Sequence, residues 1–159
     1  MNALRVNGCQ SCGFLAINDD PGHILTTDSH TLSLATDQLY LGRAYLTLGR
    51  HASKISDLTG DESSDMWDII KRYELATAQT YGAAHLTIAT LMNNAYKSPN
   101  PQPHVHSHLR PRYTNAPNIG GAIFEDPNFG EHYIRNRSHN VAPEFLHEIA
   151  QPLRALMAN

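Results

Sequence analysis

Three histidines alternate with other residues in the run His104-Val105-His106-Ser107-His108. Successive side chains of a β-strand point to opposite faces, so a strand over this run would place all three imidazoles on one face at intervals of about 6.6 Å. A neutral imidazole is a nucleophile near pH 7 and a common metal ligand. The run therefore indicates nucleophilic chemistry or a metal site, with an accidental cluster as the alternative.

The two cysteines of the chain, Cys9 and Cys12, are separated by two residues. In a reducing compartment such a C-x-x-C pair is typical of a metal half-site or of a redox pair. No thioredoxin-like βαβ pattern surrounds this pair, so the metal half-site is the favoured interpretation.

The bulk composition is that of one globular domain, with 159 residues of which 41% are hydrophobic and 17% charged. Its outlier is the count of 10 histidines. A net charge of -3 argues against a protein that coats nucleic acid. No run reaches the roughly 18 apolar residues that cross a bilayer, and the first residues lack the apolar core of a secretory signal. We therefore expect a cytoplasmic protein without membrane association.

The elements that must position these residues follow an α+β pattern. A helix is predicted from Ser63 or Ser64 to Gly82 and a C-terminal helix from Pro143 to Met157, which Pro152 should kink or break. The largely consecutive strands predict an antiparallel sheet of about five strands. The predicted strands are Ile24–Thr27, His30–Ala35, Ala44–Leu48, Leu86–Met92 and His104–Leu109.

Three segments are predicted to be loops: residues 1–13, 93–103 and 114–140. The second contains three prolines, and the third is rich in Asn, Gly and Pro. Pro111 is expected to end the strand that carries the histidines, because proline cannot donate to a β-ladder. The neighbouring Arg110 and Arg112 would contact phosphates or serve as structural partners, and Trp67 would pack in the core or at a dimer contact.

The histidine run and the following Leu109-Arg110-Pro111-Arg112-Tyr113 resemble the signature of the histidine triad family of nucleotide hydrolases and transferases. Upstream, residues 44–51 resemble the family's strand that ends in Pro-Lys-x-His, and residues 56–58 its link to the long helix. The cysteine pair followed by Phe14 is similar to that of zinc-binding bacterial members. The resemblance covers residues 9–113 and implies one such domain over residues 1–159, with 114–159 as a C-terminal extension.

The resemblance implies a mechanism. His106 would attack the α-phosphorus of a nucleotide to form a nucleotidyl-imidazole, which water then hydrolyses. His108 would hydrogen-bond a phosphate oxygen or the leaving group, and His104 completes the catalytic set. The implied substrates are dinucleoside polyphosphates or nucleoside phosphoramidates, and the family further implies a homodimer.

The resemblance also implies a structural zinc ion bound by two cysteines and two histidines. The corresponding positions are Cys9, Cys12, His51 and His104. Four such ligands form a closed tetrahedral site of the structural kind. In the alternative without metal, His51 would be a loop histidine that orients substrate.

Three features depart from the family pattern. Where the family has an acidic residue for the ribose hydroxyls, this chain has Ala35, and Asp37 is the expected substitute. The loop before the triad is rich in Pro instead of Gly. The predicted substrate-binding residues are Asn93, Asn100, Gln102, Asp37 and Ser107. Two alternatives to an enzyme remain: a slow or non-catalytic nucleotide-binding or sensing protein of the same fold with structural zinc, and a small zinc-stabilised interaction protein.

Overall fold

A five-stranded antiparallel sheet with the strand order β1-β2-β3-β5-β4 organises the chain. The computed structural model describes residues 6–17, 19–132 and 136–158. This sheet and its helices confirm the predicted α+β fold. The strands are β1 (His23–Thr26), β2 (His30–Leu34), β3 (Ala44–Leu48), β4 (His85–Thr90) and β5 (His106–Arg112).

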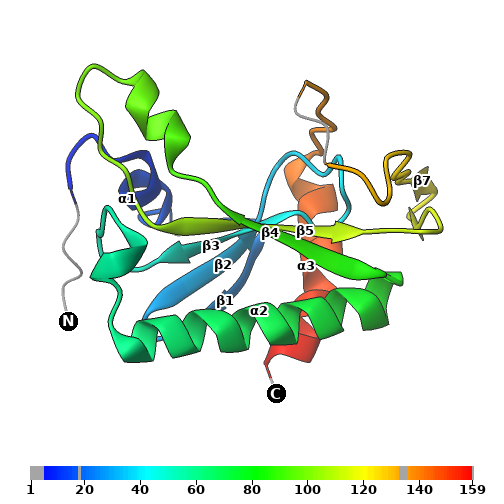
Figure 1. The fold of residues 1–159 in the computed structure, drawn as a ribbon. Helices are drawn as coiled ribbons and strands as arrows, with labels where there is room; N and C mark the ends of the chain where they lie inside the picture. Colours follow the sequence, from blue (N-terminus) through cyan, green and yellow to red (C-terminus); the bar gives the residue numbers. More distant parts are fainter. Residues whose placement is uncertain (1–5, 18, 133–135, 159) are drawn as a thin grey trace.

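Two helices, α2 (Gly60–Tyr81) and α3 (Pro143–Met157), pack on one face of the sheet, and α1 (Gln10–Phe14) lies on the other side (Figure 1). The core forms between the sheet and the two long helices, where leucines of β2 and β3 meet apolar residues of both. Burying each such side chain contributes about 1.5–3 kcal/mol. The fully buried residues include Leu32, Leu46, Ile69, Tyr73, Ile149 and Leu153.

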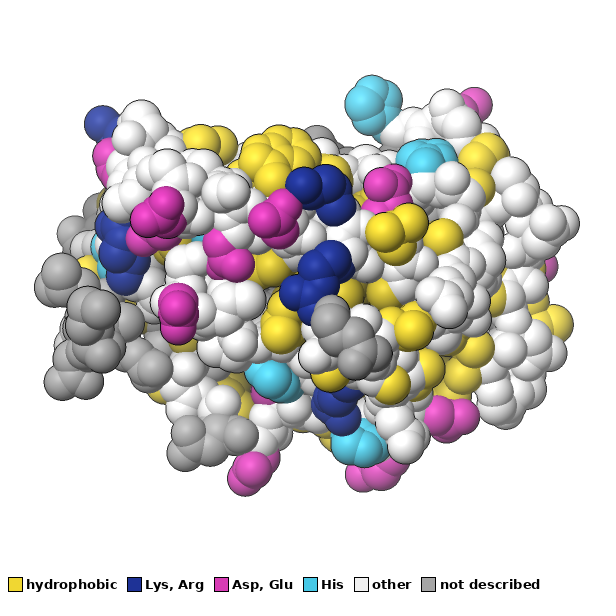
Figure 2. Space-filling view, turned by 90° about the horizontal axis from the view of Figure 1, so that it is seen from below, with side chains coloured by type: hydrophobic (Ala, Val, Ile, Leu, Met, Phe, Trp, Pro, Cys, Tyr) yellow, Lys and Arg dark blue, Asp and Glu magenta, His cyan; other side chains and the backbone are white. Residues whose placement is uncertain are grey.

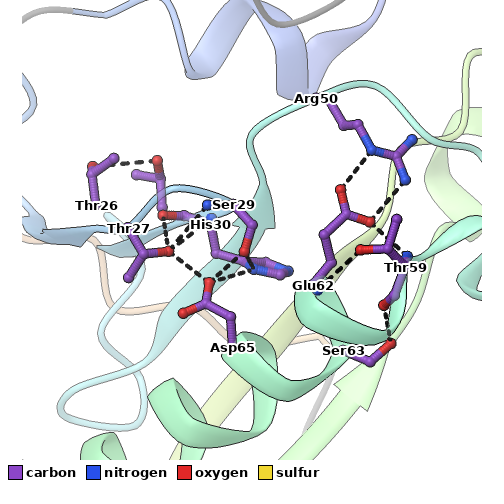
Figure 3. A network of polar contacts seen from close by, with 10 residues as sticks. Thr26, Thr27, Ser29, His30, Arg50, Thr59, Glu62, Ser63 and Asp65 are labelled. Carbon is purple, nitrogen blue, oxygen red and sulfur yellow. Dashed lines mark hydrogen bonds and ion pairs between the residues drawn. The ribbon is translucent and has the colours of Figure 1, made fainter. Parts of the chain in front are cut away.

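The start of α2 differs from its predicted start at Ser63 or Ser64. Thr59 Oγ1 accepts a hydrogen bond from the Glu62 backbone N–H, and Glu62 accepts one from the Thr59 N–H (Figure 3). This reciprocal capping box satisfies two helix donors and begins the helix at Gly60. The predicted end is confirmed, because Gly82 adopts the left-handed conformation with φ 74°.

Figure 3 shows how α2 holds the segments around the site. Arg50, the residue before His51, donates to both carboxylate oxygens of Glu62 and lowers the pKa of Glu62 to about 2. The buried His30 contacts Asp65 of the same helix, and burial lowers the pKa of His30. The N-terminal half of α2 therefore anchors the turn between β1 and β2 and the chain that leaves β3.

The predicted break at Pro152 is wrong, because α3 continues through this residue to Met157. Pro152 removes one backbone donor, while its neighbours Ile149 and Leu153 are fully buried in the core that includes the sheet. This burial outweighs the missing hydrogen bond. The predicted bounds of the helix, Pro143 and Met157, are confirmed.

The strand that carries the histidines is displaced from its predicted bounds. It begins at His106 instead of His104, and Pro111 does not end it. The backbone carbonyl of Arg112 accepts from Ala84 on the β4 side, so the nitrogen of Pro111 faces the other side, where the pairing with β3 has ended at Leu109. A missing donor is tolerated there. The predicted strand Ala44–Leu48 is confirmed at both ends, and the remaining predicted strands differ by one or two residues at their ends.

The three predicted loops contain short elements. The 3₁₀ helices η1 (Ile55–Asp57) and η2 (Asn93–Lys97) lie before α2 and after β4, and a hairpin of β6 (Asn118–Ile119) and β7 (Ala122–Ile123) lies within 114–140. The cysteine-bearing segment, predicted as a loop, forms α1. Cys9 is the N-cap of this helix, and its Sγ accepts a hydrogen bond from the Cys12 backbone N–H. Cysteine is a weak acceptor, so sequence rules for helix caps do not signal this start.

Trp67 does not belong to the core, since it is 52% exposed on α2, and Leu75 two turns on is 70% exposed. The face of the molecule in Figure 2 carries hydrophobic side chains among charged ones of both signs. The dimer contact predicted for Trp67 stays a prediction. In the described ranges, no helix is both long and apolar enough to cross a membrane.

The two arginines after the triad, Arg110 and Arg112, contact different partners. Arg112 forms an ion pair that stabilises the structure. Its guanidinium, 2% exposed, donates to both oxygens of Asp126 at 2.6 and 2.9 Å and to the backbone carbonyls of Asn128 and Glu131. This ion pair ties the segment after β7 to the end of β5.

We expect Asp126→Asn to lower the free energy of unfolding by about 3–5 kcal/mol, because it leaves a buried guanidinium without its counter-charge. Denaturant unfolding of the purified variant measures this change. The control is Asp68→Asn, which removes the exposed partner of Lys71 and should change stability by about 0.5 kcal/mol or less. Equal effects of the two substitutions would contradict the structural role of Asp126.

Candidate functional site

All three histidines of the run line one cavity of about 510 Å³. The pairing of β3 with β5 places Tyr45 beside His108 and Thr47 beside His106, so these four side chains share a face. Residues of α1 and of the segment after β4 also line the cavity. Its volume lies in the range of small-molecule sites.

The orientation of His106 follows from its hydrogen bond to the backbone. Its Nδ1 lies 2.8 Å from the carbonyl oxygen of His104. A carbonyl only accepts, so Nδ1 carries the proton and Nε2 has a free lone pair. His106 is half-buried and lines the cavity. In the neutral ring, Nε2 is therefore the nucleophilic nitrogen.

His108 is held in its neutral form. Burial lowers the pKa of His108 to about 3, helped by the charge of Arg110 and by His106 and Arg43, while a hydrogen bond to the Leu91 backbone acts in the opposite direction. The ring of Tyr45 packs edge-on against it, with centroids 4.9 Å apart. His108 thus stays uncharged across the neutral pH range.

Beside the cavity, two thiols and two imidazoles converge from three segments of the chain. The ligand atoms of Cys9, Cys12, His51 and His104 all lie within 4.8 Å of one another. The Nδ1 atom of His104 lies 3.4 Å from Cys9 Sγ and 3.5 Å from Cys12 Sγ, and Cys12 Sγ lies 3.6 Å from Nδ1 of His51. A tetrahedral zinc site has sulfur–nitrogen separations of about 3.6 Å. The donor set and these three separations therefore fit a zinc ion.

The surroundings of the cluster also suit a metal. Nε2 of His104 lies 2.8 Å from the Leu48 carbonyl oxygen, so it carries the proton and leaves Nδ1 free to bind a cation. Both cysteines are buried free thiols, and burial raises the pKa of Cys9. Metal binding would release that proton and stabilise the thiolate. His104 thereby joins the two sites: its ring belongs to the cluster, and its carbonyl orients His106.

Solved structures with the same architecture include histidine triad proteins. A zinc-bound histidine triad family protein from Mycobacterium smegmatis is 18% identical, with a TM-score of 0.61, and the match covers 95% of this chain and 94% of that one. A Hit-like protein from Bartonella henselae is 14% identical, with a TM-score of 0.65 and coverage of 96% and 98%. A diadenosine triphosphate hydrolase from Plasmodium falciparum is 16% identical, with a TM-score of 0.61 and coverage of 88% and 78%.

The chain has the histidine triad fold. The likeness extends over almost the whole chain, which confirms the fold that the histidine run predicts. No model of a known protein family matches the chain, and no curated protein matches it in sequence.

Within this histidine triad fold, the predicted substrate-binding residues divide into two groups. Asn100 and Gln102 line the cavity. The others do not appear in its lining. Asn93 begins η2, and the adjacent Asn94 lines the cavity instead. Ser107 is buried on the other face of the sheet, with its hydroxyl 2.8 Å from that of Thr90.

Asp37 also lies outside the cavity lining, where Ala35 and Thr36 are found instead. Its carboxylate pairs with Arg43 and accepts the backbone N–H groups of Leu39 and His139. It therefore serves the structure of the turn after β2. Sequence reasoning missed Tyr45 and Thr47, although the period-2 alternation of residues 44–48 beside the histidine strand could have found both.

Proposed function

We propose that the protein is a nucleotide hydrolase or nucleotidyltransferase that acts through a nucleotidyl intermediate on His106. The observation that carries the proposal is the hydrogen bond from Nδ1 of His106 to the His104 carbonyl, which directs the lone pair of Nε2 into the cavity. A neutral imidazole with a free lone pair needs no base to activate it.

In the proposed reaction, Nε2 of His106 attacks the α-phosphorus of the bound nucleotide and the leaving group departs. Water then attacks the same phosphorus and releases the nucleoside monophosphate; an alcohol or amine in place of water would make the enzyme a transferase. The Nδ1 proton stays on the ring and remains hydrogen-bonded to the His104 carbonyl throughout, so the ring keeps its orientation in both steps.

The proposed substrates are dinucleoside polyphosphates or nucleoside phosphoramidates. The cavity volume and its amide side chains, Asn94, Asn100 and Gln102, suit a polar ligand of nucleotide size. The similarity to a solved diadenosine triphosphate hydrolase supports the first class. The predicted homodimer and the cytoplasmic location stay predictions.

We further propose that Cys9, Cys12, His51 and His104 bind a structural zinc ion. Four protein ligands fill a tetrahedral shell, so the ion would have no position open to substrate. It would stabilise the contact between α1 and the segment before β5. The zinc-bound histidine triad protein of the same fold supports this proposal.

Turnover of a substrate panel tests the proposed function. The purified protein is incubated with dinucleoside polyphosphates and nucleoside phosphoramidates, and the release of nucleoside monophosphate is followed by chromatography. We expect turnover with at least one class, and unchanged turnover in His132→Ala, a variant of an exposed histidine outside the cavity lining. Nucleotide binding without turnover would instead favour the sensing protein, which Ala35 in the cavity lining supports.

A further inference from the structure

Arg110 lies two residues after His108 on β5 and is 4% exposed. We propose that Arg110 makes the site selective for phosphoanhydride substrates over phosphoramidates, because its guanidinium requires an unprotonated Nδ1 on the buried His108, and this neutral imidazole cannot protonate a leaving group. This inference rests on the proposed function and assigns a substrate preference to the same site.

The contact between the two side chains determines where the imidazole proton lies. Nη2 of Arg110 lies 3.2 Å from Nδ1 of His108. A guanidinium has only donors and keeps its charge at all relevant pH values, so Nδ1 must accept. The ring therefore carries its one proton on Nε2.

The other groups around His108 also oppose a second proton. His106 packs against it with ring centroids 5.1 Å apart, Tyr45 covers another side, and Arg43 adds positive charge. Among the described residues that act on its charge, none is a carboxylate. Asp37, an acidic side chain of the same region, is paired with Arg43. Among the described groups that act on the charge of His108, the Leu91 backbone alone favours an imidazolium.

A phosphoanhydride needs no proton from His108. Nε2 of His106 forms a bond to the α-phosphorus, the bond to the bridging oxygen breaks, and its electron pair leaves on a phosphate that is a stable anion near pH 7. In the second step water forms a bond to the phosphorus and the bond to Nε2 breaks. The electron pair of that bond returns to the imidazole, and the proton of the water passes to solvent.

A phosphoramidate differs at the leaving atom. When its phosphorus–nitrogen bond breaks, the electron pair remains on an amine nitrogen that must gain a proton in the same step. His108 has only its Nε2 proton, and giving it up would create an imidazolate. A well-placed general acid accelerates such steps by about 10²–10⁴-fold. The absence of one at His108 therefore disfavours phosphoramidates by a factor in this range.

The ratio of kcat/KM for diadenosine triphosphate to that for adenosine 5′-phosphoramidate tests the inference. We expect the ratio to exceed about 100 in the wild-type protein, to remain within about threefold in Arg110→Lys, and to fall by more than about threefold in Arg110→Met, where burial still opposes an imidazolium but Nδ1 is free to take a proton. Lysine keeps a cationic donor for Nδ1, whereas methionine keeps much of the volume without one.

Nitrogen NMR of His108 reports which of its ring nitrogens carries a proton. A merely structural role of Arg110 would not change this protonation. We expect an unprotonated Nδ1 in the wild type and in Arg110→Lys, and a protonated or mixed Nδ1 in Arg110→Met. A wild-type ratio near one, or a wild-type Nδ1 that carries a proton, would overturn the inference even if Arg110→Met fails to fold.

The failure of the inference is distinguishable from that of the proposed function. If the wild type hydrolyses both substrates with similar kcat/KM and His106→Ala abolishes both activities, the proposed function stands and the role of Arg110 is wrong. If the wild type hydrolyses neither substrate, both proposals are overturned.

Discussion

Replacing His106 by alanine is expected to lower nucleotide hydrolysis by about 10⁴-fold or more, the scale on which removal of a covalent nucleophile acts. The alanine lacks the Nε2 lone pair that the His104 carbonyl directs into the cavity. Because His106 is half-buried and is not one of the four clustered ligands, the zinc content should stay near one per chain. Steady-state kinetics and elemental analysis of the same preparation measure both quantities.

The matched control for this substitution is His85→Ala. His85 is an exposed histidine on the neighbouring strand β4, where its ring contacts Phe129 instead of the cavity. Its removal should leave kcat within about twofold, as for an ordinary surface change. Turnover in His106→Ala at the wild-type rate would contradict the proposed mechanism.

Cys9→Ser is expected to lose zinc and stability together. The substitution removes a thiolate that lies 3.4 Å from Nδ1 of His104 and leaves three ligands around the cation. Structural zinc contributes directly to the free energy of folding. We expect a loss of about 3 kcal/mol or more, which for a chain of this length lowers Tm by about 6–12 °C or more.

Chelation provides the control for the cysteine substitution. A chelator should lower the Tm of the wild type to that of Cys9→Ser and should leave the variant unchanged, because only the wild type has zinc to lose. Turnover should fall in both cases, since the carbonyl of His104 orients His106 while its ring binds the metal. A wild-type protein that contains no zinc would contradict the ligand assignment.

The histidine strand could be predicted from sequence because alternation is a local property. The family resemblance added the Cys–His cluster, whose members lie up to 95 residues apart and meet only through the fold. Asp37 shows the limit of counting along the chain: it lies two residues from the cavity-lining Ala35, and the turn after β2 directs its carboxylate to Arg43.

Two prolines also show that local sequence rules do not capture tertiary contacts. Local rules predict that Pro111 ends its strand and that Pro152 breaks its helix, yet both elements continue. The reasons are tertiary: β3 no longer pairs at Pro111, and the residues around Pro152 are buried against the sheet. The role of Arg110 also depended on the structure, since sequence left it between phosphate contact and structural partner.

Trapping the covalent intermediate tests the central claim most directly. The protein is mixed with a dinucleoside polyphosphate, quenched during turnover under conditions that preserve phosphorus–nitrogen bonds, digested and sequenced by mass spectrometry. The account predicts one nucleoside monophosphate unit on His106, and none on His104 or His108. Turnover with the nucleotide attached to another residue, or with no attached nucleotide at any time during the reaction, would contradict it.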